Sequence, residues 1–89
     1  MLAKIPAQQP DFRLEMLDDE LLLYHPAATK IMYCNATASL VWQLCNGQRS
    51  VEEIIALLAN AYPEAADSLP ADVTAALQQF VDHGAITLA

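Results

Sequence analysis

The sequence has few cations and little glycine. Four Lys and Arg stand against eleven Asp and Glu, which gives a net charge of −7. A charge of this sign repels phosphate backbones and anionic lipid headgroups, so we expect neither nucleic acid nor membrane as a partner. The only two glycines, Gly47 and Gly84, fall where helices are predicted to end. That leaves no glycine-rich loop to hold a nucleotide phosphate.

Long apolar runs and a disulfide framework are also missing. No stretch approaches the roughly 20 residues that span a bilayer, and the first ten residues lack the apolar segment of a signal peptide. We therefore expect a cytoplasmic protein. In that compartment Cys34 and Cys45 are reduced thiols, and their spacing fits no zinc motif. The sequence predicts no metal and no cofactor.

The chain does contain enough apolar material for one small core. Apolar types make up 55% of the 89 residues and charged types 17%, a composition typical of a folded domain rather than a disordered segment. The length excludes a two-domain enzyme. Residues 1–11, with two prolines and no periodicity, are predicted to form a flexible N-terminal arm, and residues 12–89 a single domain.

Strand patterns fill the first part of this domain. Residues 13–17 alternate charged and apolar types, Asp18-Asp19-Glu20 supplies turn chemistry, and residues 21–25 form a short apolar run, which together predict a β-hairpin. Residues 31–34 are β-branched and aromatic and too few for a helix, so we predict a third strand. The acidic turn lacks the oxygen spacing of a calcium loop, which favours a solvated turn over a cation site.

Three helices are predicted after the strands. Asn35 is a strong N-cap type before residues 36–46, and Ser50-Val51-Glu52-Glu53 matches the capping box that opens a second helix. A third helix runs from about Pro70 to Gly84, and residues 86–88 favour a short terminal strand.

The order of these elements predicts an α+β fold, with a small N-terminal antiparallel three-stranded sheet followed by three helices. The same elements describe a winged helix-turn-helix. Within the first helix, Trp42 shares a face with Ala38 and Cys45, and we expect that face to lie in the core.

The histidines and cysteines of the sequence form no recognisable catalytic motif. His25 and His83 are the only side chains that titrate near neutrality when unperturbed, and neither lies in a triad or metal motif. Cys34, with Asn35 beside it, would be the nucleophile of a Cys–His pair. Its segment is apolar and has no base nearby in sequence, which favours a buried, inert thiol. We do not expect an enzyme.

The strand at residues 31–34 carries apolar side chains on both faces. Either the protein covers both faces itself, or the strand lies at a sheet edge whose unpaired N–H and C=O groups accept an added strand. An edge of this kind could also pair with a second copy of the chain and form a homodimer. The residues alone leave these possibilities open.

Four segments, in their order and spacing, carry a family resemblance: YCNATA at 33–38, WQLCNGQRSVEEI at 42–54, Asp72-Val73, and FVDHGAI at 80–86. With them, residues 24–86 resemble the PqqD family, small RiPP recognition elements that act as peptide chaperones for ribosomally made, enzymatically modified peptides. The resemblance implies a winged helix-turn-helix variant. It also implies a role around coenzyme PQQ or related peptide products, without indicating which product.

The resemblance further implies two partners, the leader of a precursor peptide and a radical SAM or other peptide-modifying enzyme. The leader would add as a strand beside the third strand, in the groove between it and the third helix. On this chain the implied peptide-binding residues are Ile31, Met32, Tyr33, Cys34, Val73, Leu77, Phe80 and Val81.

The rival function is that of a winged helix-turn-helix DNA-binding regulator. A recognition helix normally presents Arg, Lys, Asn or Gln to base edges. The third predicted helix offers only Gln78 and Gln79, and no Lys or Arg, which favours the peptide.

Overall fold

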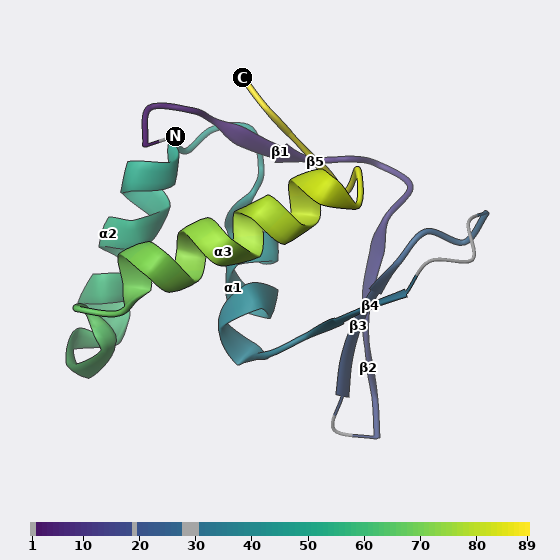
Figure 1. Cartoon of the computed structure of the whole chain (residues 1–89), viewed down its shortest axis with the longest axis horizontal. Helices are drawn as coiled ribbons and strands as arrows, with labels where there is room; N and C mark the ends of the chain where they lie inside the picture. The colour runs from purple at the N-terminus through teal and green to yellow at the C-terminus, as the bar shows by residue number, and fades with distance from the viewer. Residues whose placement is uncertain (1, 19, 28–30) are drawn as a thin grey trace.

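A small antiparallel sheet stands beside three helices in the computed structural model of the chain (Figure 1). The structure describes residues 2–18, 20–27 and 31–89. The sheet order is β2-β3-β4, which leaves β4 at one edge. The predicted hairpin and third strand are confirmed by the three strands: β2 (Arg13–Leu17), β3 (Glu20–Tyr24) and β4 (Ile31–Cys34).

The hairpin between β2 and β3 turns at Asp18, whose φ of 49° is the left-handed conformation that Asp tolerates in a turn. Asp19, the second residue of the predicted acidic turn, lies outside the described residues. Among the residues that are described, no group of three His, Cys, Asp or Glu side chains could hold a metal ion.

Three helices follow the sheet, and they confirm the predicted α+β fold class: α1 (Ala36–Leu44), α2 (Val51–Ala61) and α3 (Leu69–Asp82). A short 3-10 helix, η1 (Pro63–Ala65), connects α2 to α3. The long helix α3 packs against both α1 and α2, and in Figure 1 it crosses in front of α1. None of the described helices is long and apolar enough to cross a membrane.

The helix ends follow the capping chemistry of the sequence. The Asn35 side-chain oxygen accepts a hydrogen bond from the Ala38 N–H at 2.8 Å. In the predicted capping box, which is confirmed, the Ser50 hydroxyl accepts from the Glu53 N–H and the Glu53 carboxylate accepts from the Ser50 N–H. Helix α1 ends at Leu44, two residues before its predicted end. Cys45 is its C-cap, with a non-helical ψ of 68°.

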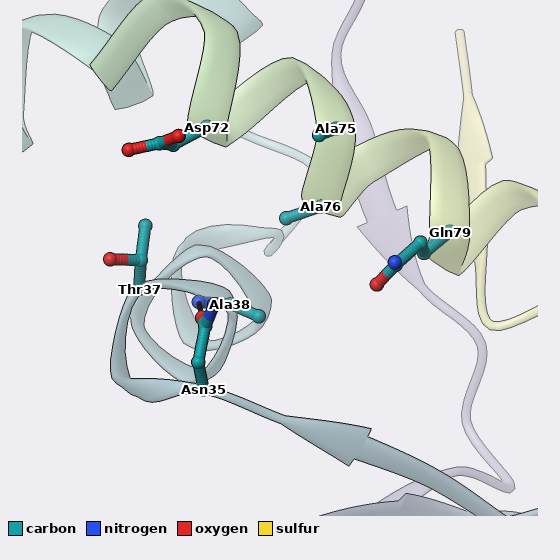
Figure 2. A pocket seen from close by; sticks show the side chains of 7 residues that line it. All are labelled: Asn35, Thr37, Ala38, Asp72, Ala75, Ala76 and Gln79. Carbon is teal, nitrogen blue, oxygen red and sulfur yellow. Dashed lines mark hydrogen bonds between the residues drawn. The ribbon is translucent and has the colours of Figure 1, made fainter. Parts of the chain in front are cut away.

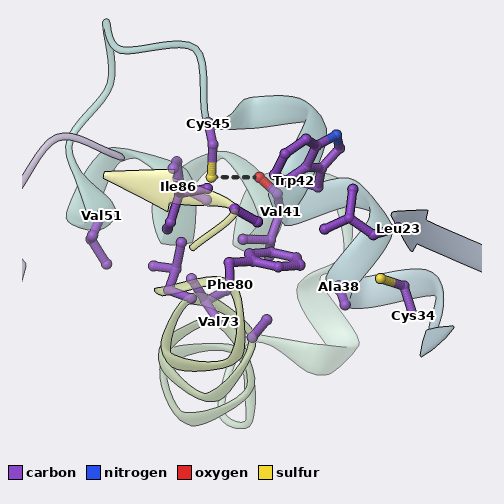
Figure 3. Packing of buried hydrophobic residues seen from close by; sticks show 14 of the residues in the cluster. Leu23, Cys34, Ala38, Val41, Trp42, Cys45, Val51, Val73, Phe80 and Ile86 are labelled. Atoms are coloured by element: carbon purple, nitrogen blue, oxygen red, sulfur yellow. Dashed lines mark hydrogen bonds between the residues drawn. The ribbon is translucent and has the colours of Figure 1, made fainter. Parts of the chain in front are cut away.

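The core lies between α1, α2, α3 and the inner face of the sheet (Figure 3). Trp42 is buried as predicted, with its ring 5.5 Å from that of Phe80 in an edge-on arrangement and 6.4 Å from that of Phe12. Cys45 is fully buried on the same helix end, and its thiol donates to the Val41 carbonyl at 3.1 Å. Both placements agree with the face predicted for the first helix.

The start of the chain corrects a prediction. Residues 1–11 were expected as a flexible arm, but Pro6–Gln8 form a strand, β1, which pairs antiparallel with β5 (Ile86–Leu88) in a second, two-stranded sheet. Pro6 is fully buried, and the Gln8 side-chain amide donates to the Trp42 carbonyl at 2.8 Å. Its partner strand lies at the far end of the chain, so no local pattern in the first eleven residues could predict the pairing.

The same segment also caps α2. The Leu2 and Lys4 carbonyls accept hydrogen bonds from the Glu52 and Val51 N–H groups, two of the amides that the first turn of a helix leaves without a partner inside the helix. The N-terminal segment therefore joins the end of the chain to the start of α2.

Candidate peptide-binding site

The backbone of β3 determines which groups of β4 are free. In an antiparallel pair of strands, residue pairs that exchange both backbone hydrogen bonds alternate with pairs that exchange none. The pair that closes a two-residue hairpin is of the bonded kind. Leu17 and Glu20 close the β2–β3 hairpin, so the alternation directs the backbone groups of Leu21 and Leu23 toward β4.

The open side of β4 then belongs to Ile31 and Tyr33. Met32 pairs with Leu23 and Cys34 with Leu21, so the backbone groups of Met32 and Cys34 point into the sheet. The N–H and C=O groups of the other two residues point away from it. Among the described residues no strand occupies that side of β4. It is a free edge of the kind to which an extended peptide can add.

The side chains of β4 resolve the question left by its composition. Met32 and Cys34 are buried in the core, whereas Ile31 and Tyr33 are 55% and 69% exposed on the outer face of the sheet. The protein therefore covers one face of this strand and leaves the other open.

A hollow of about 210 Å³ lies between the start of α1 and the side of α3 (Figure 2). One of its lining residues is Asn35, which directly follows β4. In Figure 2, Ala76 points from α3 toward Ala38, and Asp72 stands above Thr37. We call it the α1–α3 hollow; its lining residues are Asn35, Thr37, Ala38, Asp72, Ala75, Ala76 and Gln79.

The helix residues that the family resemblance implied do not line this hollow. Val73, Leu77 and Phe80 have no exposed surface, because their side of α3 packs onto α1 and α2. Val81 is partly exposed and is not among the lining residues. A peptide in the α1–α3 hollow would therefore contact the neighbouring side of the helix.

That neighbouring side was missed in the sequence. Asp72, Ala75, Ala76 and Gln79 follow one another at i, i+3, i+4 and i+7, which places them on one stripe of the helix. The sequence signal is the pair of alanines between two polar residues, beside the apolar stripe. Small side chains at such a place allow another backbone to come close.

The thiols of the site are unsuited to nucleophilic chemistry. Burial raises the pKa of the Cys34 thiol, and burial raises the pKa of Cys45 to about 12. A nucleophilic cysteine requires the opposite shift. Neither histidine is bonded to a thiol: His25 Nε2 lies 3.7 Å from an Asp11 carboxylate oxygen, and His83 Nδ1 lies 2.9 Å from the Gln79 carbonyl.

Comparison with known proteins gives the family of the chain and no individual relative. No curated protein and no solved structure matches the chain significantly. Residues 20–86 match the family model described as coenzyme PQQ synthesis protein D (PqqD), and they include β3, β4 and all three helices. Since the match covers well over half of the 89 residues, the chain belongs to the PqqD family.

Proposed function

We propose that this chain is a non-catalytic peptide chaperone that binds the leader of a ribosomally made precursor peptide and presents it to a radical SAM or other peptide-modifying enzyme. Membership in the PqqD family implies a chaperone role associated with the biosynthesis of PQQ or of similar peptide products. The observation that carries the finer proposal is the free edge of β4, a strand that is followed directly by Asn35, a lining residue of the α1–α3 hollow.

The leader would bind by two kinds of contact. Its backbone would pair with the N–H and C=O groups of Ile31 and Tyr33, which supplies affinity that depends little on the leader sequence. Beyond the end of β4, its side chains would enter the α1–α3 hollow next to Ala75 and Ala76, which supplies specificity. An unfolded leader loses conformational entropy on docking, so we expect a dissociation constant on the order of micromolar. This corresponds to a binding free energy of about −8 kcal/mol.

No observation favours the DNA-binding alternative. Helix α3 contains two aspartates, two glutamines and no Lys or Arg, so it offers no cation to a phosphate or to the edge of guanine.

The test of the proposal measures how tightly a selected peptide binds when β4 lacks one backbone N–H group. The probe is the tightest-binding peptide selected from a displayed library of short random peptides. Tyr33→Pro removes an N–H that points to the open side, and edge strands tolerate proline. We expect this variant to keep most of its thermal stability. It should bind the probe at least about fivefold more weakly than Tyr33→Ala does, since a hydrogen bond contributes about 1 kcal/mol.

Tyr33→Ala is the matched control, because it removes the same ring and keeps the N–H. Met32→Pro is the opposite case: its N–H bonds to β3, so the substitution should destabilise the fold. Equal affinity of Tyr33→Pro and Tyr33→Ala for the probe would refute strand addition at β4. A library that yields no binding peptide would refute the chaperone function.

The same edge fits a second copy of the chain, and we include a homodimer through β4 in the proposal. Two identical edge strands related by a two-fold axis can pair antiparallel. Sedimentation should then show a concentration-dependent dimer that saturating probe peptide converts to monomer. A dimer that the peptide leaves intact would place the contact elsewhere.

A further inference from the structure

A second hollow adjoins the proposed leader site. It measures about 200 Å³ and lies between α1, the end of α2 and η1. Thr37 lines both this hollow and the α1–α3 hollow, so the two meet at the first turn of α1. We call it the α1–α2 hollow; its lining residues are Ala36, Thr37, Leu40, Leu58, Tyr62, Glu64, Ala65 and Leu69.

We propose that the α1–α2 hollow binds one large apolar side chain of the leader, from the part that lies N-terminal to the segment added to β4. This inference rests on the proposed function and deepens it, because it assigns a second specificity site to the same ligand.

The direction of the leader follows from the strand. Antiparallel pairing is the more stable arrangement of two strands. A leader antiparallel to β4 places its earlier residues beside Cys34, the last residue of the strand, and its later residues beside Ile31. Residues before the paired segment therefore pass Asn35, which lines the α1–α3 hollow, and then Thr37, which lines both hollows. The residues to be modified leave at the opposite end.

The chemistry of the hollow fits an apolar side chain. Leu40, Leu58 and Leu69 are among its lining residues, and so is Tyr62, which is 43% exposed. Its volume falls below the roughly 300–1,000 Å³ of sites for free small molecules. A single side chain carried by a longer ligand is therefore the better occupant.

The charges around the two hollows restrict the ligand further. Asp72 lines the first and Glu64 the second, and no Lys or Arg from the described part of the chain lines either one. A leader with Lys or Arg next to its apolar anchor would be attracted to these carboxylates, and an acidic one repelled.

The test combines a substitution that fills the α1–α2 hollow, called the plug, with shortening of the bound peptide, in a double-mutant cycle. Ala36→Trp adds a large ring at a residue that lines only the second hollow, and Ala56→Trp adds the same ring on an exposed side of α2 away from both hollows. The probe is the selected peptide described above, whole and shortened stepwise from either end. Tyr62→Ser, which removes the ring of another lining residue, is an independent second variant.

We expect Ala36→Trp to weaken binding of the whole peptide about tenfold or more, as for loss of one buried apolar side chain. Shortening the peptide at its N-terminus should weaken its binding to the wild-type protein by the same factor. The shortened peptide should then bind Ala36→Trp no more weakly than it binds wild type. Ala56→Trp should bind like wild type, and Tyr62→Ser should follow Ala36→Trp.

Unchanged affinity of both Ala36→Trp and Tyr62→Ser for the whole peptide would overturn the assignment. The assignment would also be overturned if shortening the peptide at its C-terminus, and not at its N-terminus, removed the effect of Ala36→Trp. The Tyr33→Pro experiment separates the two proposals: a plug without effect alongside a strong Tyr33→Pro effect rejects only the second hollow. The reverse result rejects strand addition and keeps an apolar peptide site.

Discussion

At the scale of single residues, burial decides what the side chains of this protein do. The family resemblance implied Val73, Leu77 and Phe80 as peptide contacts, and the structure places all three in the core without exposed surface. Ala75, Ala76 and Thr37 looked unremarkable and line the α1–α3 hollow. The large apolar residues hold the domain together, and the small ones beside them leave a hollow between α1 and α3.

Trp42 should be the single most costly side chain to remove. Its ring contacts Phe80 and Phe12, and its exposed fraction is 4%. We expect Trp42→Ala to lower the free energy of unfolding by about 3–5 kcal/mol, measured by urea denaturation. Trp42→Phe, which keeps an aromatic ring, should lose clearly less. A red-shifted, water-like fluorescence spectrum of the native protein would contradict this placement.

Cys45 should make the protein sensitive to alkali. Burial raises its pKa from 9.0 to about 12, so between these values the unfolded chain releases a proton that the folded protein keeps. Its contribution to stability is complete below pH 9 and is lost as the pH rises toward 12. We expect the free energy of unfolding to fall by about 1.4 kcal/mol per pH unit from this thiol.

Cys45→Ala is the control for this pH dependence, because it removes the titrating group from the same position. The difference between the two unfolding curves isolates the thiol from tyrosines and lysines that titrate in the same range. Parallel curves for wild type and Cys45→Ala above pH 9 would show that the thiol ionises equally in both states.

At the scale of elements, the helix ends and the edge of β4 differ in how far their backbone groups are satisfied. α2 is the best-capped helix: Ser50, Glu53 and the N-terminal segment together serve the amides of its first turn. β4 is the opposite case, a strand whose backbone is satisfied on one side only among the described residues. The first stabilises the domain, and the second is the edge at which we propose that a peptide binds.

Ser50→Ala should lower the free energy of unfolding by about 1 kcal/mol. Ser68 is the matched control: it precedes α3 as Ser50 precedes α2, but its hydroxyl donates to the Ala65 carbonyl and caps no helical amide. Thermal denaturation of both variants measures the difference. Equal losses would show that the capping box adds nothing specific.

The capping box should also depend on pH. The hydrogen bonds from Ser50 to the carboxylate lower the pKa of Glu53 below its usual 4.5. The contribution of this carboxylate is present above that usual pKa and is lost as the pH falls through the lowered value. The stability difference between wild type and Glu53→Gln should therefore shrink in acid. A difference that stays constant from neutral to acidic pH would contradict it.

At the scale of the whole molecule, the two ends of the chain close the structure. The N-terminal strand β1 pairs with β5, and Leu2 and Lys4 bond to the start of α2. Two small sheets thus flank the helices, one formed within the hairpin region and one from the chain ends (Figure 1). The open edge of β4 belongs to the first of these sheets.

Deleting residues 1–9 should therefore destabilise the protein by several kcal/mol, on the order of 1 kcal/mol for each lost backbone hydrogen bond. Leu2→Ala and Lys4→Ala are the controls. Both side chains are exposed and both carbonyls remain, so these variants should unfold like wild type. A deletion variant with an unchanged urea midpoint would mean that the segment is a loose arm after all.

Local patterns in the sequence determined most of the fold. Alternation over residues 13–17, the short apolar segment 31–34 and the caps at Asn35 and Ser50 each act within a few residues, so their effect is legible in the chain itself. The order of strands and helices, the class of the fold and the place of Trp42 followed from them.

Only the tertiary structure decided the rest, because it depends on residues distant in sequence. β1 exists because β5, nearly 80 residues later, offers it a partner. Which stripe of α3 lines the α1–α3 hollow depends on how that helix packs on α1 and α2, and both stripes have helical spacing. The sequence predicted a strand at residues 31–34 and left open whether it lies at a sheet edge. The sheet order then determined that one side of it stays open.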